Sequence, residues 1–344
     1  MLEYGLEGFM FDIHNRRYTG SKYKLQDWIY DLVGQNCHGQ SFADLFAGTG
    51  VVASRFMDDF NRIIVNDLLY SNWVVYKAFF EDSPKRKTVL NKYCLEFQQY
   101  VNEKVHENYV SKSFGNKFFN IQDAKIIGCI REKIETLKST LREKEYFVLL
   151  ASLLYSADKA ANTVGHYDAY IRKASIEPHF QFELIKPLNT SHKKIEIYRE
   201  DTNQLVKRVK ADICYIDPPY NSRQYSRFYH VLENIAEWNK PKLYGVAMKP
   251  RAQKMSDYCR VSAPIVFADL INNLQTKYIV VSYNNTYDSK SSSSRNKITL
   301  EEIQDTLATK GKVKKFNTRH AFFNTGKTDF ADHQELLFIT EVKR

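Results

Sequence analysis

The stretch SFADLFAGTGVVASRFMDDFNRIIVND at residues 41–67 decides how the fold of this chain is interpreted. It starts with an apolar run that ends in two glycines, continues with a helical stretch, and ends with a second apolar run, RIIVND. This order predicts a strand, a glycine turn, a helix and a second strand. Such alternation predicts a parallel sheet with crossover helices, in which ligands bind at the carboxyl ends of the strands.

The same alternation returns in the C-terminal part of the chain. We expect strands within IEIYRED, ADICYIDPPY, KYIVVSYNN, GKVKKF and ELLFIT, separated by helices, and a surface loop at the serine run 291–294. Residues 81–190 instead contain long, Lys-rich and aromatic helical segments. The sequence therefore predicts an α/β fold, with a Rossmann-like domain formed by 1–80 and 191–344 and a mainly helical domain inserted at 81–190.

The composition is that of a folded, basic protein. The 344 residues include 50 Lys and Arg against 40 Asp and Glu, a formal net charge of +10, and 43% are hydrophobic. This charge favours a polyanionic partner, although many soluble proteins are also basic. No stretch reaches the roughly 18 apolar residues of a membrane helix, and the N-terminus lacks the order of a signal peptide. We therefore expect a cytoplasmic protein without membrane association.

The cysteines predict no metal site. The chain has five of them, widely scattered, and none belongs to a CxxC pair or stands beside a histidine at metal-ligand spacing. We expect reduced thiols, and for Cys214, within the apolar run ICYI, a buried and inert one.

The turn FAGTG at 46–50 has features of a ligand-binding turn. Gly48 and Gly50 lack Cβ atoms and let a ligand approach the backbone where a helix starts. The spacing matches neither GxGxxG nor the phosphate-binding loop pattern, so a packing turn is an equal interpretation of this motif alone. Asp67, at the end of the next strand, can accept hydrogen bonds from the hydroxyls of a ribose, or it can cap a helix. Together the turn and the acid suggest a cofactor that contains a nucleoside.

The segment ADICYIDPPYNSRQY at 211–225 is the most informative one. Its apolar strand runs into Asp217, Pro218, Pro219 and Tyr220, and the two prolines fix an extended turn that cannot continue the sheet. Asp217 and the carbonyl of Pro218 can accept the N–H groups of an exocyclic amine, while Tyr220 stacks on a planar base. The alternative is a strand end with an exposed acid, which the joint presence of FAGTG disfavours.

In these motifs and their order the chain resembles the S-adenosylmethionine-dependent adenine-N6 DNA methyltransferases, specifically the Dam-like alpha group that includes FokI-type modification enzymes. That family has a lysine motif before FxGxG, an inserted target recognition domain, and then DPPY. This chain has RYTGSKYKL at 17–25, FAGTG, the insertion, and DPPY at 217–220. The resemblance covers both halves of the sheet. It implies S-adenosylmethionine as cofactor, double-stranded DNA as substrate, and a role in a restriction-modification system together with a cognate restriction endonuclease.

The resemblance also implies roles for individual residues. Tyr18 and Lys22 match the residues on the carboxylate side of the cofactor, and Asp67 matches the ribose-binding acid. Asp201 matches the acid that receives the adenine amino group of the cofactor, with Thr202 beside it. The other positions of the cofactor-binding set are Phe46, Gly48 and Gly50, in the turn beneath the methionine moiety, and Asp44 before it.

The implied reaction depends on positioning, because the methyl group of a sulfonium is already activated. Asp217 and the carbonyl of Pro218 would direct the lone pair of the amino nitrogen at the methyl group and stabilise the positive charge that develops there. A base stacked in duplex DNA cannot reach such a pocket. We therefore expect the base to be flipped out of the helix, at a cost that stacking on Tyr220 partly offsets.

Three segments are candidates for contacts with DNA. Segment 240–260 has six basic residues and one acid, which predicts contacts with phosphates or, alternatively, a solubilising surface. Segment 221–230 interleaves arginines with aromatic residues, and 156–173 ends the insertion with residues that either reach DNA or pack against the catalytic domain. The candidates are Lys249, Arg251 and Lys254 in the first segment, Arg223 and Arg227 in the second, and Asn162, His166 and Arg172 in the third.

Three alternatives stay open on the sequence. An RNA base methyltransferase would share similar turns, but the lysine motif and the long insertion resemble the DNA enzymes. A cytosine-N4 DNA methyltransferase commonly has serine at the position of Asp217. A catalytically silent DNA-binding protein on the same scaffold predicts losses in FAGTG or DPPY, and both motifs are intact here.

Overall fold

The computed structural model describes residues 10–172, 175–286, 296–319 and 333–343, and the chain divides into two compact units. The serine run at 291–294 lies outside the described residues. The predicted insertion falls within the first unit, which also includes segments from both sides of it, so the domain boundaries at 80 and 191 stay a prediction. The first unit consists of Met1–Gly20, Leu69–Ser191 and Ser226–Gln253, and the second of Ser21–Leu68, His192–Tyr225 and Lys254–Arg344.

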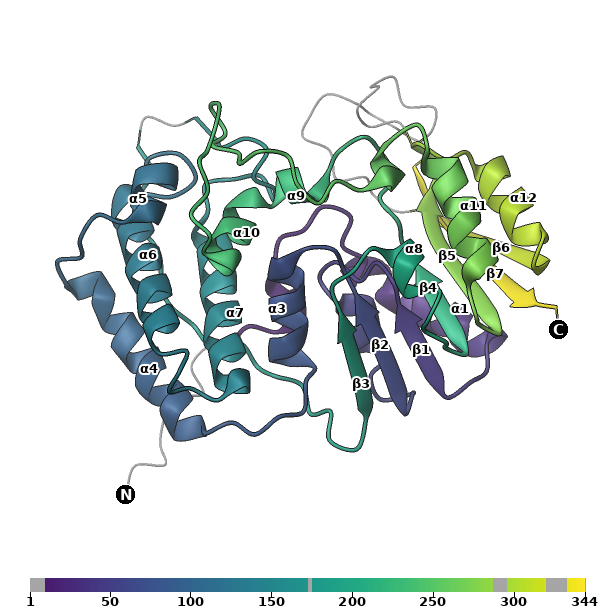
Figure 1. Ribbon diagram of the computed structural model, residues 1–344, viewed down its shortest axis with the longest axis horizontal. Coiled ribbons are helices and arrows are strands. Elements are labelled where there is room, and N and C mark those ends of the chain that lie inside the picture. The colour runs from purple at the N-terminus through teal and green to yellow at the C-terminus, as the bar shows by residue number, and fades with distance from the viewer. Residues whose placement is uncertain (1–9, 173–174, 287–295, 320–332, 344) are drawn as a thin grey trace. The chain divides into compact units, whose positions relative to one another are not determined.

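A seven-stranded sheet organises the second unit (Figure 1). The strand order is β3-β2-β1-β4-β5-β7-β6, in which β1 to β5 pair in parallel and β7 runs antiparallel to both of its neighbours. Each predicted strand segment overlaps one of these strands, which confirms the α/β class and the Rossmann-like sheet. The strands are β1 (Ser41–Asp44), β2 (Arg62–Asn66), β3 (Lys194–Tyr198), β4 (Ile213–Ile216), β5 (Tyr278–Asn284), β6 (Gly311–Arg319) and β7 (Gln334–Val342).

The strand order brings two turns to neighbouring positions. The chain runs from β1 outward to β2 and β3, and then returns to β4 on the other side of β1. Because Asp44 of β1 lies opposite Tyr215 of β4 in parallel register, the segments that follow these strands leave the same edge of the sheet side by side. Ligands of open α/β sheets bind at such a reversal of strand order. FAGTG and DPPY therefore share one edge.

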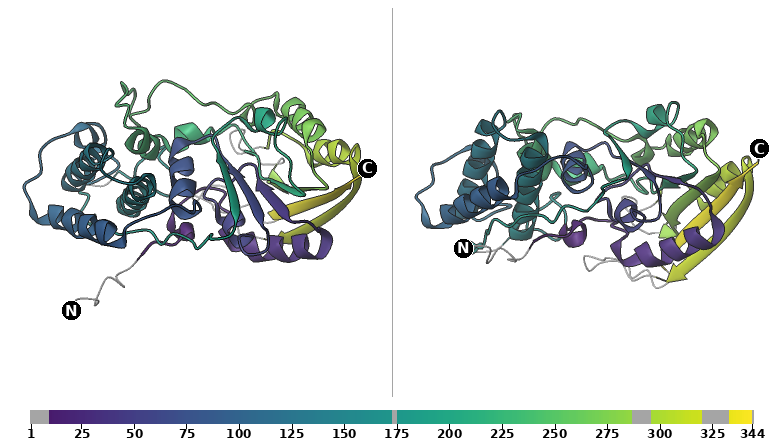
Figure 2. Two further views of the ribbon diagram at one scale, coloured as in Figure 1. Left: turned by 60° about the horizontal axis from the view of Figure 1, so that its bottom comes forward. Right: turned by 90° about the horizontal axis from the view of Figure 1, so that it is seen from below.

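Helices cover both faces of this sheet (Figure 2). On one face, Ala43 and Cys214 share a hydrophobic core with α8, α11 and α12. On the other face, Phe42 stacks on Phe56, with ring centroids 4.4 Å apart, near the packed pair α1 and α2. Neighbouring residues of a strand point to opposite faces, which explains why the strands are continuous apolar runs. These helices are α1 (Gln26–Asn36), α2 (Val51–Arg55), α8 (Thr202–Leu205), α11 (Ala263–Asn273) and α12 (Leu300–Ala308).

The first unit is built around helix α7 (Glu143–Ala160). All residues of α7 except Glu143 and Lys159 are buried, and the helix packs against α3, α4, α6 and α10. This agrees with the helical character predicted for the insertion. The other α-helices of this unit are α3 (Tyr70–Phe79), α4 (Lys87–Gln99), α5 (Tyr109–Phe114), α6 (Ile121–Thr136) and α10 (His230–Glu237). The short remaining helices of the chain are α9 (Tyr225–Phe228), η1 (Ile13–Asn15), η2 (Tyr23–Leu25), η3 (Tyr100–Asn102) and η4 (Asp257–Cys259).

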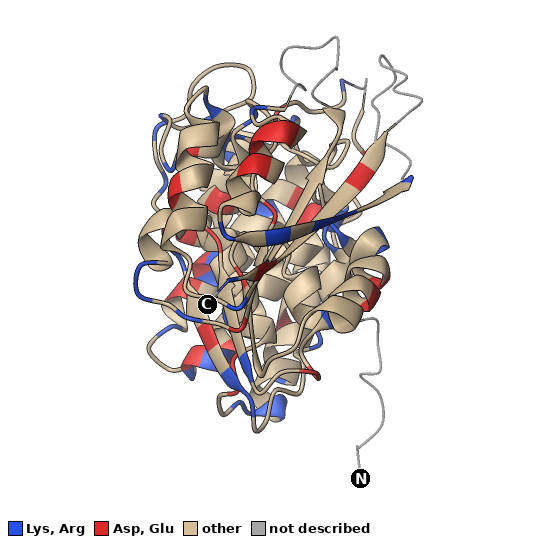
Figure 3. Cartoon of the chain, turned by 90° about the vertical axis from the view of Figure 1, so that its right-hand side faces the viewer, with Lys and Arg blue, Asp and Glu red and all other residues tan. Residues whose placement is uncertain are grey.

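Charged residues of both signs are interspersed along the helices and strands (Figure 3). β6 is an edge strand, and its side chains Lys312, Lys314, Lys315 and Arg319 are exposed. Charged residues on an edge strand oppose pairing with other chains. Part of the basic surplus is therefore explained by protection of the sheet edge.

Removal of the Glu145 carboxylate is expected to destabilise the first unit. Glu145 is fully buried and accepts hydrogen bonds from the backbone N–H groups of Arg86 (2.7 Å) and Arg142 (3.0 Å) and from the Arg86 guanidinium (2.7 and 2.9 Å). The bonds from Arg86 lower the pKa of Glu145 to about 2. Glu145→Ala leaves these donors without their acceptor, and we expect a loss of about 3 kcal/mol in the free energy of unfolding at pH 7.

Denaturant titration of wild type and variant would measure this loss. The pKa of Glu145 is about 2 in the folded protein, against about 4.3 in the unfolded chain, so the ionised carboxylate stabilises the fold fully above about pH 4.3. The difference in unfolding free energy between wild type and variant should therefore shrink as the pH falls from about 4.3 toward about 2. Glu143→Ala is the matched control, because Glu143 lies in the same helical turn with a side chain that is 67% exposed. Equal losses in the two variants would contradict the argument.

Candidate active site

The turn after β1 is closed by backbone N–H groups that donate to Asn66 and Asp67 at the end of β2. Gly48 and Gly50 have φ angles of 54° and 81°, a backbone region that favours glycine. The N–H of Gly48 donates to Asp67 Oδ2 (3.0 Å), and the N–H of Ala47 donates to the carbonyl of Asn66 (2.9 Å). Asp67 is not the N-cap of the helix that follows, because α3 begins after Leu69. The carboxylate of Asp67 is thus oriented beside the two glycines.

Asn66 is a residue of this edge to which the sequence analysis assigned no role. Its fully buried side chain donates from Nδ2 to the carbonyls of Leu45 (3.2 Å) and Glu200 (3.1 Å) and to Thr202 Oγ1 (3.2 Å). Its Oδ1 accepts from the N–H of Glu200 at 3.1 Å. One amide thereby joins the chain segments that follow β1 and β3. The only sequence signal was its position next to Asp67 at a strand end.

The predicted cofactor residues near β3 have local structural roles. Asp201 is exposed and caps α8, where it accepts the N–H of Gln204 (3.2 Å). Thr202 is buried and donates to the carbonyl of Leu45 (3.1 Å). Thr202 therefore fixes the start of α8 against the end of β1 and holds Asp201 at this edge of the sheet.

Phe46 of the glycine turn is supported by an aromatic residue that the sequence analysis did not single out. The rings of Phe46 and Tyr258 meet edge to face with centroids 5.1 Å apart, and the Tyr258 hydroxyl donates to Asn203 Oδ1 at 2.8 Å. Tyr258 lies in the segment predicted to face phosphates, but its side chain is buried. That part of the segment belongs to the core of the second unit.

Asp44 lies beneath the turn and faces the protein interior. It is 1% exposed, and its Oδ2 accepts the N–H of Ala53 in α2 at 3.2 Å. Burial raises the pKa of Asp44 well above its ordinary value, and the negative charge of Asp217 adds to this effect. The contact shown for Asp44 is structural, between β1 and α2.

Lys22, Asp217 and Tyr220 form a closed cluster at the end of β4. The ammonium of Lys22 lies 2.9 Å from Asp217 Oδ2 and donates to the hydroxyl of Tyr220 at 2.7 Å. The hydroxyl of Tyr220 in turn donates to Asp217 Oδ1. The Lys22 side chain is 4% exposed and that of Asp217 is 15% exposed. The structure thus places Lys22 against the DPPY turn; its predicted position beside the cofactor carboxylate stays a prediction.

The electrostatics of this cluster raise the pKa of both Lys22 and Asp217. Burial opposes the charge on Lys22, but Asp217, Glu335 and Asp44 outweigh it and raise the pKa of Lys22. Burial also raises the pKa of Asp217, although Lys22 and the Tyr220 hydroxyl act in the opposite direction. Asp217 therefore depends on Lys22 to stay ionised in a site where other acids are close.

The DPPY turn is held on its far side by residues from and beyond β5. The backbone carbonyl of Tyr220 accepts the N–H of Lys297 at 2.7 Å, and the rings of Tyr220 and Tyr283 meet edge to face at 4.8 Å. Pro218 is buried and Pro219 is half-buried. This packing fixes the direction of the Asp217 carboxylate.

Tyr18 and His166, two of the predicted site residues, belong to the first unit, where each ring stacks on another aromatic side chain. The ring of Tyr18 stacks on Tyr229 with centroids 4.4 Å apart and an interplanar angle of 9°. His166 stacks on Phe228 at 4.7 Å. These contacts give Tyr18 and His166 a packing role within that unit, and their predicted roles toward cofactor and DNA stay predictions.

The residues predicted to contact DNA differ in the contacts that their side chains make within the protein. Asn162 is 7% exposed, and its Nδ2 donates to the carbonyls of Lys117 (3.0 Å) and Ile171 (2.7 Å), which favours the packing interpretation. Lys249 pairs with Asp168, and Arg227 donates to the carbonyl of Pro250 at 2.7 Å. Arg172, Arg223 and Arg251 are exposed, and Lys254 is half-exposed.

Comparison with known proteins places the chain in a family. Residues 18–321 match the family of D12 class N6 adenine-specific DNA methyltransferases. The type II methyltransferase M.NlaIII of Neisseria lactamica is 31% identical over 335 residues, which is 92% of this chain and 95% of that protein. M.CviAII of Paramecium bursaria Chlorella virus 1 is 33% identical over 278 residues, which is 77% of this chain and 82% of that protein.

A third relative, the type II methyltransferase M.FokI of Planomicrobium okeanokoites, is 31% identical over 316 residues. The match covers 86% of this chain but 47% of M.FokI, so this chain spans about half the length of that protein. Within the described parts of the chain, none of the helices has the length and apolar character needed to cross a membrane. The match along most of the sequence shows that the chain belongs to the family of D12 class N6 adenine-specific DNA methyltransferases.

Proposed function

We propose that this protein transfers the methyl group of S-adenosylmethionine to the N6 amino group of adenine at a specific site in double-stranded DNA, in the cytoplasm of a bacterium. It would serve as the modification enzyme of a restriction-modification system, with a cognate endonuclease acting on the same site. The observation that carries the proposal is the position of Asp217 and Tyr220 at the end of β4, beside the glycine turn of β1. The family supports adenine over the cytosine and RNA alternatives.

The residues around the glycine turn fit the proposed cofactor. The positive φ angles of Gly48 and Gly50 create a turn without Cβ atoms, and the carboxylates of Asp67 and Asp201 lie next to the ends of β2 and β3. Such acids suit ribose hydroxyls and an adenine amino group. When bound, the cofactor supplies a methyl group activated by its sulfonium. The turn and the two acids would bind and orient it at this edge.

Asp217 must exchange partners for the reaction. Both of its carboxylate oxygens are engaged, one by Lys22 and the other by Tyr220. An incoming amino group would donate an N–H to one of these oxygens and its second N–H to the carbonyl of Pro218. Tyr220 would release its hydroxyl contact and stack on the flipped base. Fixed acceptors then stabilise the positive charge that develops on nitrogen.

The pH dependence of methyl transfer should report the state of Asp217. Because burial raises the pKa of Asp217, its protonation on acidification removes the acceptor at a higher pH than for an exposed aspartate. We expect the single-turnover rate to fall on the acid side along one protonation curve whose midpoint lies above about 3.9, the ordinary value for aspartate. A rate that stays constant down to that pH, measured on protein that is still folded, would contradict this.

Arg251 is the basic residue that we expect to contribute most directly to DNA affinity. Its side chain is exposed, whereas Lys249 already pairs with Asp168. Arg251→Glu should weaken DNA binding and reduce the slope of log affinity against log salt by about one. Lys249→Glu should have a smaller effect on this slope, and Lys315→Glu on the edge strand β6 is the control. An unchanged slope in Arg251→Glu would place the DNA elsewhere.

The proposed activity is tested by incubating the protein with methyl-labelled S-adenosylmethionine and mixed-sequence duplex DNA, followed by digestion to nucleosides. Label in N6-methyladenine is the expected result. Label in N4-methylcytosine would keep the mechanism and overturn the target, and label found in RNA only would overturn the substrate. Absence of label from both nucleic acids would favour a silent DNA-binding protein.

A further inference from the structure

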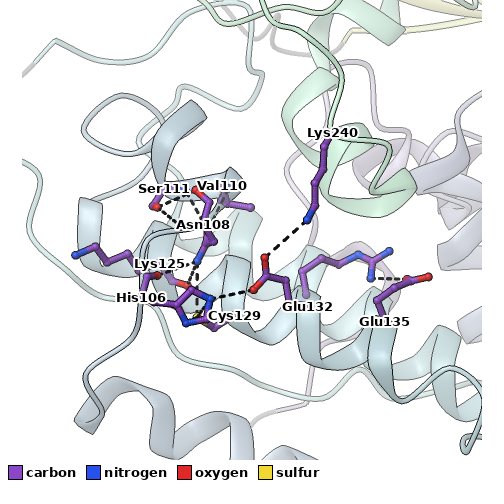
Figure 4. A network of polar contacts seen from close by, with 10 residues as sticks. His106, Asn108, Val110, Ser111, Lys125, Cys129, Glu132, Glu135 and Lys240 are labelled. Atoms are coloured by element: carbon purple, nitrogen blue, oxygen red, sulfur yellow. Dashed lines mark hydrogen bonds and ion pairs between the residues drawn. The ribbon is translucent and has the colours of Figure 1, made fainter.

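Three potential metal ligands meet in the first unit, and none of them belongs to the motifs described above. His106 lies in the segment before α5, and Cys129 and Glu132 lie one turn apart on α6 (Figure 4). The imidazole Nε2 of His106 is 3.1 Å from Glu132 Oε2, and Cys129 Sγ lies 3.8 Å from Nδ1 and 4.0 Å from Nε2 of the same ring. One donor atom from each residue lies within 4.8 Å of the others.

These separations approach those of a tetrahedral zinc site. Zinc binds sulfur at about 2.3 Å and nitrogen or oxygen at about 2.0 to 2.2 Å, so donor atoms at tetrahedral corners are roughly 3.3 to 3.6 Å apart. For Nε2 of His106, the distance of 3.1 Å to Glu132 Oε2 and the distance of 4.0 Å to Cys129 Sγ lie on either side of this range. His106 is the donor that can adjust, because its side chain is 71% exposed. Small rotations of the His106 side chain would therefore bring the three donor atoms to tetrahedral distances.

The Cys129 sulfur has a polar neighbour of the kind that orients a metal ligand. Asn108 Nδ2 lies 3.7 Å from Cys129 Sγ and also donates to the carbonyl of Lys125 at 2.8 Å, which fixes the amide. Gly128 makes room for this amide, because a Cβ atom at position 128 would collide with the Asn108 side chain. Hydrogen bonds to metal ligands from such neighbours orient the ligands and tune their basicity.

Glu132 is also positioned by a neighbour. Lys240 lies 3.8 Å from Glu132 Oε1, so the other oxygen, Oε2, faces the imidazole (Figure 4). A thiol, an imidazole and a carboxylate together suit zinc, whereas magnesium and calcium prefer oxygen ligands. The alternative is an ordinary contact between an exposed histidine and a carboxylate, as between His179 and Asp123. The cluster at His106 differs from that pair because a cysteine sulfur lies beside the imidazole.

We propose that His106, Cys129 and Glu132 bind one zinc ion, with solvent as the fourth ligand, and that the ion ties the segment before α5 to α6. Zinc binds cysteine as the thiolate, so the Cys129 thiol would lose its proton to solvent on binding. The cysteine spacing in the sequence indicated no metal site, because His106 and Cys129 are 23 positions apart. The proposal is independent of the methyltransferase activity.

Cobalt titration of the chelator-treated full chain tests this site directly. A cobalt–thiolate charge-transfer band should grow to one equivalent of metal per chain and disappear when zinc is added. Cys129→Ser should abolish the band, and His106→Gln and Glu132→Gln should each weaken binding at least tenfold. The matched controls are Cys94→Ser, a buried thiol of the same unit, and His179→Gln, an exposed histidine beside a carboxylate.

A second measurement does not depend on the thiol variant folding normally. Zinc at about 100 times its wild-type Kd should raise the Tm of the wild type and both controls by roughly 5 °C, and should raise the Tm of His106→Gln by no more than about half as much. His106 is exposed, so this variant should fold normally. The proposal is overturned if no charge-transfer band forms, if the band survives in Cys129→Ser, or if zinc raises the Tm of His106→Gln as much as that of the wild type.

Discussion

Asp217→Ala is expected to lower the single-turnover rate of methyl transfer by at least about 10³-fold, while affinities for DNA and cofactor change little. Asp217 supplies the ionised acceptor at the end of β4, and its carboxylate is the group that can bind the amino nitrogen as positive charge develops. This interaction strengthens toward the transition state, so its loss lowers the rate rather than binding.

The controls for this prediction separate chemistry from folding. Removal of Asp217 also leaves the buried ammonium of Lys22 without its carboxylate, so the unfolding of the variant must be compared with that of the wild type. Asp217→Asn keeps the shape of the side chain and should retain more activity than Asp217→Ala. Asp257→Ala removes an acid of the same unit that is 55% exposed and should leave the rate unchanged. Near wild-type turnover of Asp217→Ala would refute the assignment of this residue.

Lys22→Met should shift the acid side of the pH–rate profile to higher pH. Lys22 lowers the pKa of Asp217, whereas burial raises it. Without the Lys22 ammonium, burial and Glu335 still raise the pKa of Asp217, while the hydrogen bond from Tyr220 still lowers it. Asp217 therefore becomes protonated at a higher pH in the variant. Below the new midpoint the rate should fall about tenfold for each unit of pH, because only the ionised form of Asp217 accepts the amino group.

The same variant distinguishes two roles of Lys22. If Lys22 acts through Asp217, activity recovers as the pH is raised and the KM for S-adenosylmethionine stays near that of the wild type. If Lys22 instead binds the cofactor carboxylate, the KM rises and the acid midpoint does not move, which would contradict the role inferred from the ion pair. Lys24→Met is the matched control, because Lys24 is exposed in the short helix η2, which begins directly after Lys22.

Much of the second unit could be predicted because its strands and turns are indicated by residues that are close together in the sequence. The apolar runs SFAD and ICYI are bounded by glycine or proline, and each became a strand, β1 and β4. Gly48 and Gly50 adopt the positive φ angles that made glycine necessary in the turn. Strand propensity, chain direction and turn chemistry depend on neighbouring residues, so the sequence is sufficient to indicate them.

The questions that the sequence left open concern contacts between residues that are far apart along the chain. Asn162 could have faced DNA or the protein interior, and only the folded chain shows its amide engaged by two backbone carbonyls. Asn66 had no motif of its own, yet it joins the segments after β1 and β3. Burial and hydrogen-bond partners are properties of the packed chain, which a linear pattern does not contain.

The sequence by itself determined the α/β class, the seven strands and the residues of the FAGTG and DPPY turns, because each follows from local hydrophobic pattern and backbone restriction. The tertiary structure decided which side chains meet. Lys22 and Tyr220 are 198 positions apart and His106 and Cys129 are 23 apart, yet each pair is in contact. Such contacts arise when elements pack around a common core, and their electrostatics follow from burial that exists only in the folded protein.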